Sequence, residues 1–414
     1  MNGNDRAIVG LVMVAHAMVH TLELSIPILV TIWLVEFSVT TATMGLAVTV
    51  GMALFGIGAL PAGVLVDAYG SQRLIAGCLV GMGLSFLVLG LADSFLLVTL
   101  ALVLWGVAAS VYHPAGLALI SKGVTPADRG RAFGYHGMAG NVGIALGPLV
   151  TAILLMALDW RTVVAVLAVP AGLAAAFALR ADVEETAGID ESTGRANGGS
   201  RDTGSISSLP EFLADTRRLF VGAFFVVFGV AMLSGIYYRG VITFLPELLG
   251  AVPAFAAVEF GETEFEPSRY VYAGLLVIGV AGQYLGGYLV DRFPREWGVA
   301  AAFGALTVAT VLFLPAVEAG VGPLLVASAF LGFTMFVVQP INQALIADYS
   351  SPEVRGLSYG YTYFGVFGVG ALGATLAGTA LVYSEATMFL TFAAVAAAAA
   401  GLGLVLSYWR SRKR

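Results

Sequence analysis

Three titratable residues lie close together in the first apolar stretch of the sequence. His16, His20 and Glu23 are separated by four and three positions, so they share one face if the stretch is helical. Imidazole and carboxyl groups on one stripe can pass protons to one another. We therefore expect these residues to carry protons. The alternative interpretation is that the histidines only form hydrogen bonds between helices.

Arg239 is the other charged residue that lies deep inside an apolar stretch, directly after Tyr237 and Tyr238. A charge at this depth of a bilayer costs at least ~2.5 kcal/mol, so it usually faces a cavity or a partner. A guanidinium binds carboxylate or phosphonate through two parallel hydrogen bonds, which makes Arg239 a candidate for binding an anionic solute. Two alternatives stay open: an ion pair with Glu23, and a side chain that extends to the outer membrane interface.

Four further polar residues occur in apolar stretches: His113, Gln339, Asn342 and Asn141. His113 and Gln339 each precede a proline, which removes one hydrogen bond from a helix and favours a kink. Interrupted helices commonly line the binding sites of transporters. We predict that these four residues line a cavity for the solute.

The composition indicates which elements must hold these residues. Of the 414 residues, 59% are hydrophobic and 11% are charged, whereas a soluble protein carries about 25% charged residues. Apolar runs of about 20 residues between short polar loops are typical of membrane-spanning helices. We predict an all-α membrane protein with twelve transmembrane helices. The predicted spans are 8–35, 42–66, 73–92, 95–120, 130–157, 161–179, 218–245, 270–291, 297–317, 321–346, 356–382 and 386–408.

The lysines and arginines predict the orientation. Almost all of them fall in loops on one side of the predicted spans, the side that also holds both termini and the long central loop. Positive residues collect on the cytoplasmic side of membrane proteins. We therefore expect a multi-pass protein of the cell membrane with both termini in the cytoplasm.

An internal repeat predicts the domain organisation. Tyr112-His113-Pro114 returns as Val338-Gln339-Pro340, 226 positions later, and Gly147 matches Gly373 at the same spacing. The sequence thus predicts two pseudo-symmetric six-helix bundles, residues 1–180 and 218–414, the second with a short basic tail. Residues 181–217, rich in Gly, Ser, Thr and Asp, are predicted to form a flexible cytoplasmic loop.

Two charged turns occupy matching places in the two halves. The first reads Gly63-Val64-Leu65-Val66-Asp67-Ala68-Tyr69-Gly70-Ser71-Gln72-Arg73, and the second contains Gly287, Leu289, Asp291 and Arg292. This pair resembles the signature of the major facilitator superfamily, although Pro294 and Arg295 stand where the second copy would have a glycine. The resemblance implies the fold of that family, transport by alternating access, and a cytoplasmic gate. The gate residues would be Gly63, Asp67, Gly70, Arg73, Asp291, Arg292, Arg129 and Arg355.

Two further resemblances concern the direction of transport. Gly143, Gly147 and Pro148 look like the antiporter motif of the same family, but Thr151 follows where a glycine is expected. The arginine usual in span four is also missing near Trp105. His20-Thr21-Leu22-Glu23 and Tyr112-His113-Pro114 look like the fosmidomycin-resistance exporter branch of the family. These resemblances imply export by antiport.

Other classes of protein lack their signatures in this sequence. It has no His-Glu-x-x-His and no Walker loop, and its four histidines do not have the spacing of a metal site. We expect no enzyme activity, cofactor, metal or nucleic acid. We predict a monomeric secondary active transporter, exporting a small organic solute in exchange for protons within the lipid bilayer. The alternatives are a proton-coupled symporter of an organic anion and, more remotely, a membrane sensor that does not transport.

Overall fold

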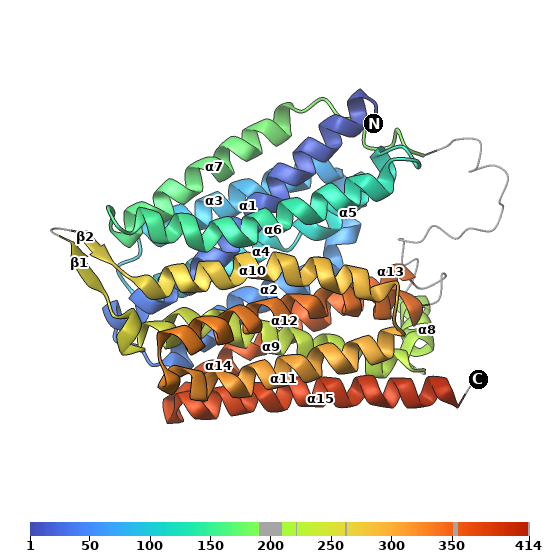
Figure 1. Ribbon diagram of the computed structural model, residues 1–414. Helices are drawn as coiled ribbons and strands as arrows, with labels where there is room; N and C mark the ends of the chain where they lie inside the picture. The colour runs from blue at the N-terminus through green and yellow to red at the C-terminus, as the bar shows by residue number, and fades with distance from the viewer. Residues whose placement is uncertain (190–208, 221, 261–262, 351–354, 413–414) are drawn as a thin grey trace. The chain divides into compact units, whose positions relative to one another are not determined.

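A computed structural model of the chain describes residues 1–189, 209–220, 222–260, 263–350 and 355–412. Within these residues the fold is almost entirely helical, and twelve helices are long and apolar enough to cross a membrane (Figure 1). This confirms the predicted all-α membrane architecture. The helix bounds differ from the predicted spans by a few residues at most ends.

The first six spans are built from seven helices. These are α1 (Gly3–Glu36), α2 (Thr41–Tyr69), α3 (Ser71–Gly90), α4 (Phe95–Ala109), α5 (Tyr112–Gly123), α6 (Arg129–Leu154) and α7 (Trp160–Arg180). The predicted fourth span is divided into α4 and α5. Pro114 has no N–H to donate to the carbonyl four residues earlier, and the break falls at residues 110–111. The proline of the matching repeat, Pro340, lies inside one continuous helix, so the two copies differ here.

The remaining elements follow the central loop. They are α8 (Leu209–Phe220), α9 (Phe224–Gly250), η1 (Pro253–Phe255), β1 (Val258–Phe260), β2 (Thr263–Phe265), α10 (Pro267–Val290), α11 (Arg295–Ala319), α12 (Val321–Asp348), α13 (Arg355–Tyr363), η3 (Phe364–Val369), α14 (Leu372–Tyr383) and α15 (Glu385–Ser411). Strands β1 and β2 pair antiparallel within the acidic loop before α10. The element η3 is a π-helix, so the predicted eleventh span is α13, this π-helix and α14.

Contacts divide the described chain into two compact units. Unit 1 comprises Met1–Ser25, Leu54–Gly147 and the described part of Leu158–Ser205, and unit 2 comprises Ile26–Ala53, Pro148–Ala157 and the described part of Ile206–Arg414. Helices α1, α2 and α6 therefore contribute to both units. The domain boundaries expected from the repeat, 1–180, 181–217 and 218–414, stay a prediction.

The first half of α2 packs directly on α14 within unit 2. The Thr41 hydroxyl donates to the Gly378 carbonyl, and the Thr49 hydroxyl donates to the Ala371 carbonyl, each at 2.8 Å. Any side chain at Gly45 would collide with the Ala374 backbone. Small residues and hydroxyls thus allow these helices to approach closely, as is common between helices in lipid.

Candidate functional site

Helix α1 places its three titratable side chains in one hydrogen-bonded row. The two Nε2 atoms of His16 and His20 are 3.1 Å apart, and His20 Nδ1 lies 2.6 Å from Glu23 Oε2. The shared helical face that the spacing predicts is therefore present. Glu23 is 2% exposed. A carboxylate this deeply buried requires partners close by, and the His20 ring is one of them.

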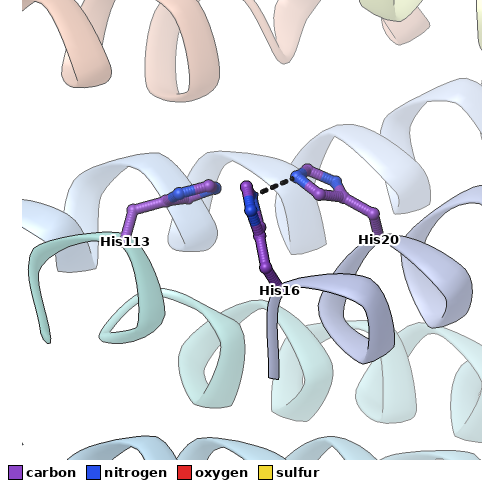
Figure 2. A group of neighbouring side chains, drawn as sticks. All are labelled: His16, His20 and His113. Atoms are coloured by element: carbon purple, nitrogen blue, oxygen red, sulfur yellow. Dashed lines mark hydrogen bonds between the residues drawn. The ribbon is translucent and has the colours of Figure 1, made fainter. Parts of the chain in front are cut away.

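Helices α5 and α6 bring two more histidines against this row. His16 Nδ1 donates to the backbone carbonyl of His136 at 2.7 Å, and the two imidazole rings stack with centroids 3.9 Å apart. The His113 ring meets the His16 ring edge-on at 5.3 Å. Figure 2 shows His16 between His20 and His113, with the dashed hydrogen bond joining His16 to His20. All four histidines of the chain thus form one cluster, which we call the histidine cluster.

Tyr112 closes the cluster on the side of α5. Its ring stacks on the His16 and His136 rings at centroid distances of 5.3 and 6.1 Å. The Tyr112 hydroxyl donates to the Val12 carbonyl of α1 at 2.7 Å, and the side chain is completely buried. This bond fixes α5 against α1, so the position of His113 relative to His16 is held by packing rather than by a flexible side chain.

A row of glycines on α6 permits the close approach to α1. A methyl group at Gly140 would lie 2.6 Å from the His16 ring, and one at Gly147 would lie 2.5 Å from the Thr21 carbonyl oxygen. At Gly143 a methyl group would collide with the Ala17 carbonyl. Gly143 and Gly147, two of the three antiporter-like residues, therefore have a local structural role, which is to let α1 pack closely against α6. Pro148 lies inside α6.

The predicted solute-binding residues other than Asn141 and His113 lie in unit 2. Arg239 of α9 is 3% exposed, and its guanidinium lies over the rings of Tyr238 and Phe367 at 5.6 and 5.3 Å. This burial argues against a guanidinium that extends to the interface. Asn342 of α12 is also buried, with no hydrogen bond to its Oδ1 among the described residues. Gln339 is partly buried on the same helix.

His113 and Asn141 belong to unit 1 instead. The structure places His113 in the histidine cluster, whereas Asn141 is partly buried on α6 directly after Gly140. The five expected cavity and proton residues of the first bundle therefore concentrate on α1, α5 and α6.

The predicted gate residues lie at helix ends, and several have local partners. Asp67 pairs with Lys122 at 2.8 Å, and both side chains are about half exposed. The Glu185 carboxylate accepts the backbone N–H groups of Ser71 and Gln72 at 2.7 and 2.9 Å, directly after Gly70. That glycine has φ +83, a conformation that favours glycine. Gly63 and Arg73 are exposed.

The other gate residues have different surroundings. Arg129 begins α6, and its side chain donates to the carbonyls of Val124 and Gly188 at 3.0 and 2.7 Å. In the second copy Asp291 follows the last residue of α10, and the Arg292 guanidinium lies over the Tyr288 ring. Arg355 begins α13, but its side chain falls outside the described part of the chain.

Sequence reasoning missed two features of unit 1. His136 was not among the expected site residues, yet its carbonyl accepts a hydrogen bond from His16 and its ring stacks on the His16 ring. Glu185 was assigned to a flexible loop, yet it caps α3. Both contacts join residues more than 110 positions apart, so no local spacing reveals them. The signal that could have indicated the first is the row of glycines on α6, which requires a close neighbouring helix.

The expectation that the histidines do not form a metal set also needs correction. It rested on their spacing in the sequence, where they are scattered. In the structure, His16, His20 and His113 each offer a ring nitrogen, and these nitrogens lie within 4.8 Å of one another. Helices that are distant in sequence bring them together, so their spacing in the sequence carries no information about this geometry.

Comparison with known proteins identifies the family. The profile of the Major Facilitator Superfamily matches residues 9–261 and 248–414. The puromycin resistance protein pur8 of Streptomyces alboniger is 41% identical over 108 residues, which are 26% of this chain and 22% of that protein. The probable L-galactonate transporter of Escherichia coli K12 is 25% identical over 131 residues, 30% and 28% of the two chains. The matches thus span less than a third of either relative.

Solved structures show the same fold over almost the whole chain. A bacterial homologue of the human lysosomal transporter Spinster, inward-facing and occupied, superimposes with a TM-score of 0.74 at 16% identity, covering 99% of this chain and 98% of that one. The nucleoside transporter NupG and a D-xylose-proton symporter give TM-scores of 0.71 and 0.72, at 15% and 12% identity, with at least 96% of each chain covered. With its twelve spanning helices, the chain is a multi-pass membrane protein and a secondary transporter, and it belongs to the major facilitator superfamily.

Proposed function

We propose that this transporter exports a small organic solute across the cell membrane in exchange for protons. Protons are carried by Glu23, His20 and His16 in the first bundle, and the solute contacts Arg239, Gln339 and Asn342 in the second. His113 and Asn141 complete the cavity, both termini face the cytoplasm, and the monomer is the working unit.

The hydrogen-bond inventory of the histidine cluster carries this proposal. The His136 carbonyl can only accept, so the Nδ1 of His16 holds a hydrogen, and a neutral His16 then has a lone pair on Nε2. If His20 likewise donates from Nδ1 to the Glu23 carboxylate, a neutral His20 also has a lone pair on Nε2. Two lone pairs would then face each other across 3.1 Å, which is repulsive. One additional proton between the two nitrogens turns this repulsion into a hydrogen bond.

The row can hold that added proton in two protonation states. In the first, His20 is an imidazolium and Glu23 is ionised. In the second, Glu23 is protonated, and a neutral His20 donates from Nε2 to His16. The movement between these states needs no rotation of a side chain, because the atoms already lie at 2.6 and 3.1 Å. A carboxylate that exchanges a proton with an imidazole is a suitable loading site for transport.

The solute side rests on Arg239. Its guanidinium is buried and lies over the rings of Tyr238 and Phe367, and a guanidinium binds planar anionic groups through two parallel hydrogen bonds. This feature favours a solute with a carboxylate or phosphonate group, and an ion pair between Arg239 and Glu23 remains the competing role. The probable L-galactonate transporter is one of the relatives, which supports symport of an organic anion as the second candidate function.

The direction of transport rests on resemblance. The motifs of the fosmidomycin-resistance exporter branch, His20 to Glu23 and Tyr112 to Pro114, both belong to the histidine cluster, and a puromycin resistance protein is among the relatives. Gly143, Gly147 and Pro148 favour antiport. In this scheme the charged residues predicted as a cytoplasmic gate open and close one side, while the contacts of Thr41 and Thr49 with α14 open and close the other.

A two-stage experiment tests the proposal. The purified chain is first screened by thermal shift at two pH values against puromycin, L-galactonate and a set of anionic and cationic solutes. Solutes that stabilise it are then loaded into proteoliposomes, and their flux is measured with and without a pH gradient. Solute accumulation against its own gradient, driven by protons, is the expected result. Binding without any flux would instead support the sensor, and flux unaffected by the pH gradient would refute proton coupling.

A further inference from the structure

The geometry of the histidine cluster points to a second occupant. We propose that His16, His20 and His113 form a binding site for a divalent transition-metal ion of the zinc class, and that this ion takes the place of the shared proton. Their three ring nitrogens lie within 4.8 Å of one another. Three imidazoles plus one open position is a recurrent arrangement for zinc, and imidazole is a preferred ligand of zinc, nickel and copper ions.

The distances require only a small closure around the ion. Two nitrogens bound to zinc at 2.0–2.1 Å in tetrahedral geometry are about 3.3 Å apart, and the Nε2 atoms of His16 and His20 are already 3.1 Å apart. The ion would separate this pair slightly and draw the His113 nitrogen inward. His113 is the second residue of α5, directly after the break between α4 and α5, so a change of its side-chain rotamer would be enough to move its ring nitrogen.

The hydrogen bonds around the two α1 histidines orient them as metal ligands. Metal-bound histidines usually donate their other ring N–H to a carboxylate or a backbone carbonyl. Here His20 Nδ1 faces the Glu23 carboxylate, and His16 Nδ1 faces the His136 carbonyl. The Nε2 lone pairs of His16 and His20 therefore face each other, where the ion would bind. The negative charge of Glu23 also offsets part of the cost of a cation in this buried place.

The rest of the cluster is compatible with an ion at this position. His136 stacks on His16, and its Nε2 has no hydrogen bond among the described residues, so it adds no positive charge if neutral. Tyr112 lies beside both rings, with its centroid 5.3 Å from that of His16 and 6.1 Å from that of His136. The fourth position on the ion is left for water or for a polar group of a solute.

The test uses the full-length chain in detergent, with any affinity tag removed and metals stripped. Zinc binding is measured by calorimetry and by competition with a chromophoric chelator. We expect one zinc ion per wild-type chain, loss of that binding in His113→Gln, and a weakening on the order of 10- to 100-fold in Glu23→Gln, which removes the negative charge that orients His20. His136→Gln is the matched control: it removes the fourth histidine but keeps the carbonyl that orients His16, so zinc binding should persist.

A spectroscopic readout on the wild type keeps the proposal testable if a variant folds poorly. X-ray absorption at the zinc edge should show three imidazole ligands and one lighter donor. Zinc binding that is absent in the wild type, equal in wild type and His113→Gln, or lost in His136→Gln would overturn the site. So would a spectrum with fewer than three imidazoles.

Inhibition of transport is a consequence that rests on the proposed function. If the ion displaces the shared proton, zinc should slow proton-driven flux in the wild type and have little effect in His113→Gln. Zinc binding without inhibition would leave the metal site intact and count against proton coupling at these residues. Conversely, proton-driven flux in a wild-type protein that binds no zinc would refute the metal site and leave the proposed function intact.

Discussion

The two repeat-related bundles use one backbone plan for different chemistry. Gly147 lies against the Thr21 carbonyl of α1, and Gly373, its repeat partner 226 positions later, lies against the Ile236 carbonyl of α9. Aligning the prolines inside α1 and α9, Pro27 and Pro246, places His20 opposite Arg239. One copy therefore carries a protonatable imidazole where the other carries a cation that does not lose its charge.

The surroundings of these two residues diverge in the same way. His20 lies in a hydrogen-bonded row with a carboxylate and a second imidazole, whereas Arg239 lies over two aromatic rings. The helix that supports α1 is a regular α-helix, while its repeat partner contains the π-helix Phe364–Val369, which presents Phe367 to Arg239. A duplicated fold thus separates a site that can gain and lose charge from one that keeps it.

The largest effect is expected from Glu23→Gln. The amide can still hydrogen-bond to His20 but cannot exchange a proton with it, so proton-driven flux should fall by roughly tenfold or more. Exchange of solute between the two sides of a proteoliposome, which needs no net proton movement, should continue. Flux driven by a pH gradient at the wild-type rate would contradict a proton role for this bundle.

Arg239→Lys should affect the other half of the comparison. An ammonium keeps the charge but loses the planar fork and the stacking on Tyr238 and Phe367. We expect binding of an anionic solute to weaken by about tenfold, which corresponds to about 1.4 kcal/mol, measured by thermal shift or calorimetry. Proton dependence should be retained in whatever flux remains. Equal binding of every solute by both proteins would remove Arg239 from the site.

A pair of glycine substitutions on α6 tests whether close packing positions the histidine cluster. Gly140→Ala places a methyl group 2.6 Å from the His16 ring, whereas nothing lies within 4 Å of a methyl group at Gly137. We expect Gly140→Ala to cost about 1–3 kcal/mol of stability through overpacking and to reduce proton-driven flux. Gly137→Ala should behave like the wild type. Identical flux and melting temperature in the two variants would argue that the approach of α6 is unimportant.

The smallest effect concerns repeat-related helix caps. The Asp159 carboxylate accepts the N–H groups of Arg161 and Thr162 at the start of α7, and the Ser384 hydroxyl accepts the Thr387 N–H at the start of α15. Hydrogen bonds, first from the Thr162 side chain, lower the pKa of Asp159. A lowered folded-state pKa gives stability above the unfolded value of about 3.9 that is lost as the pH falls through the folded value.

Replacing each cap by alanine should therefore give different pH profiles. Asp159→Ala should destabilise the protein by about 1 kcal/mol at pH 7, and this difference from the wild type should shrink in acid. Ser384→Ala should cost a similar amount at every pH, because a hydroxyl does not titrate. Thermal unfolding in detergent at neutral and acidic pH measures both, and parallel profiles would contradict the assignment of the two caps.

Much of the fold was predictable from the sequence because membrane spans depend on local composition. Apolar length identified the spans, and the spacing of His16, His20 and Glu23 predicted their contact on α1, which is an intrahelical property. The break at residues 110–111 was signalled by Pro114, but the continuation of α12 through Pro340 without a break was not. The π-helix in the eleventh span contains no proline, so no local signal distinguished it from its regular repeat partner.

The parts of the site that escaped prediction depend on packing between distant segments. The carbonyl of His136 reaches His16 across 120 positions, and whether it does so is decided by the helices that surround α1 and α6. At the start of α6, two backbone carbonyls, of Val124 and Gly188, accept hydrogen bonds from the Arg129 guanidinium. Charge patterns in the sequence could not indicate such neutral partners.

Proton release on solute binding is the most direct measurement of the central claim. The purified full-length chain, in weakly buffered detergent with a pH indicator, is mixed with a solute that stabilised the wild type in the screen. An antiporter whose proton lies between His16 and His20 should release roughly one proton per bound solute, and Glu23→Gln should bind the solute while releasing far fewer. Solute binding without proton release by the wild type, or undiminished release by Glu23→Gln, would contradict the account.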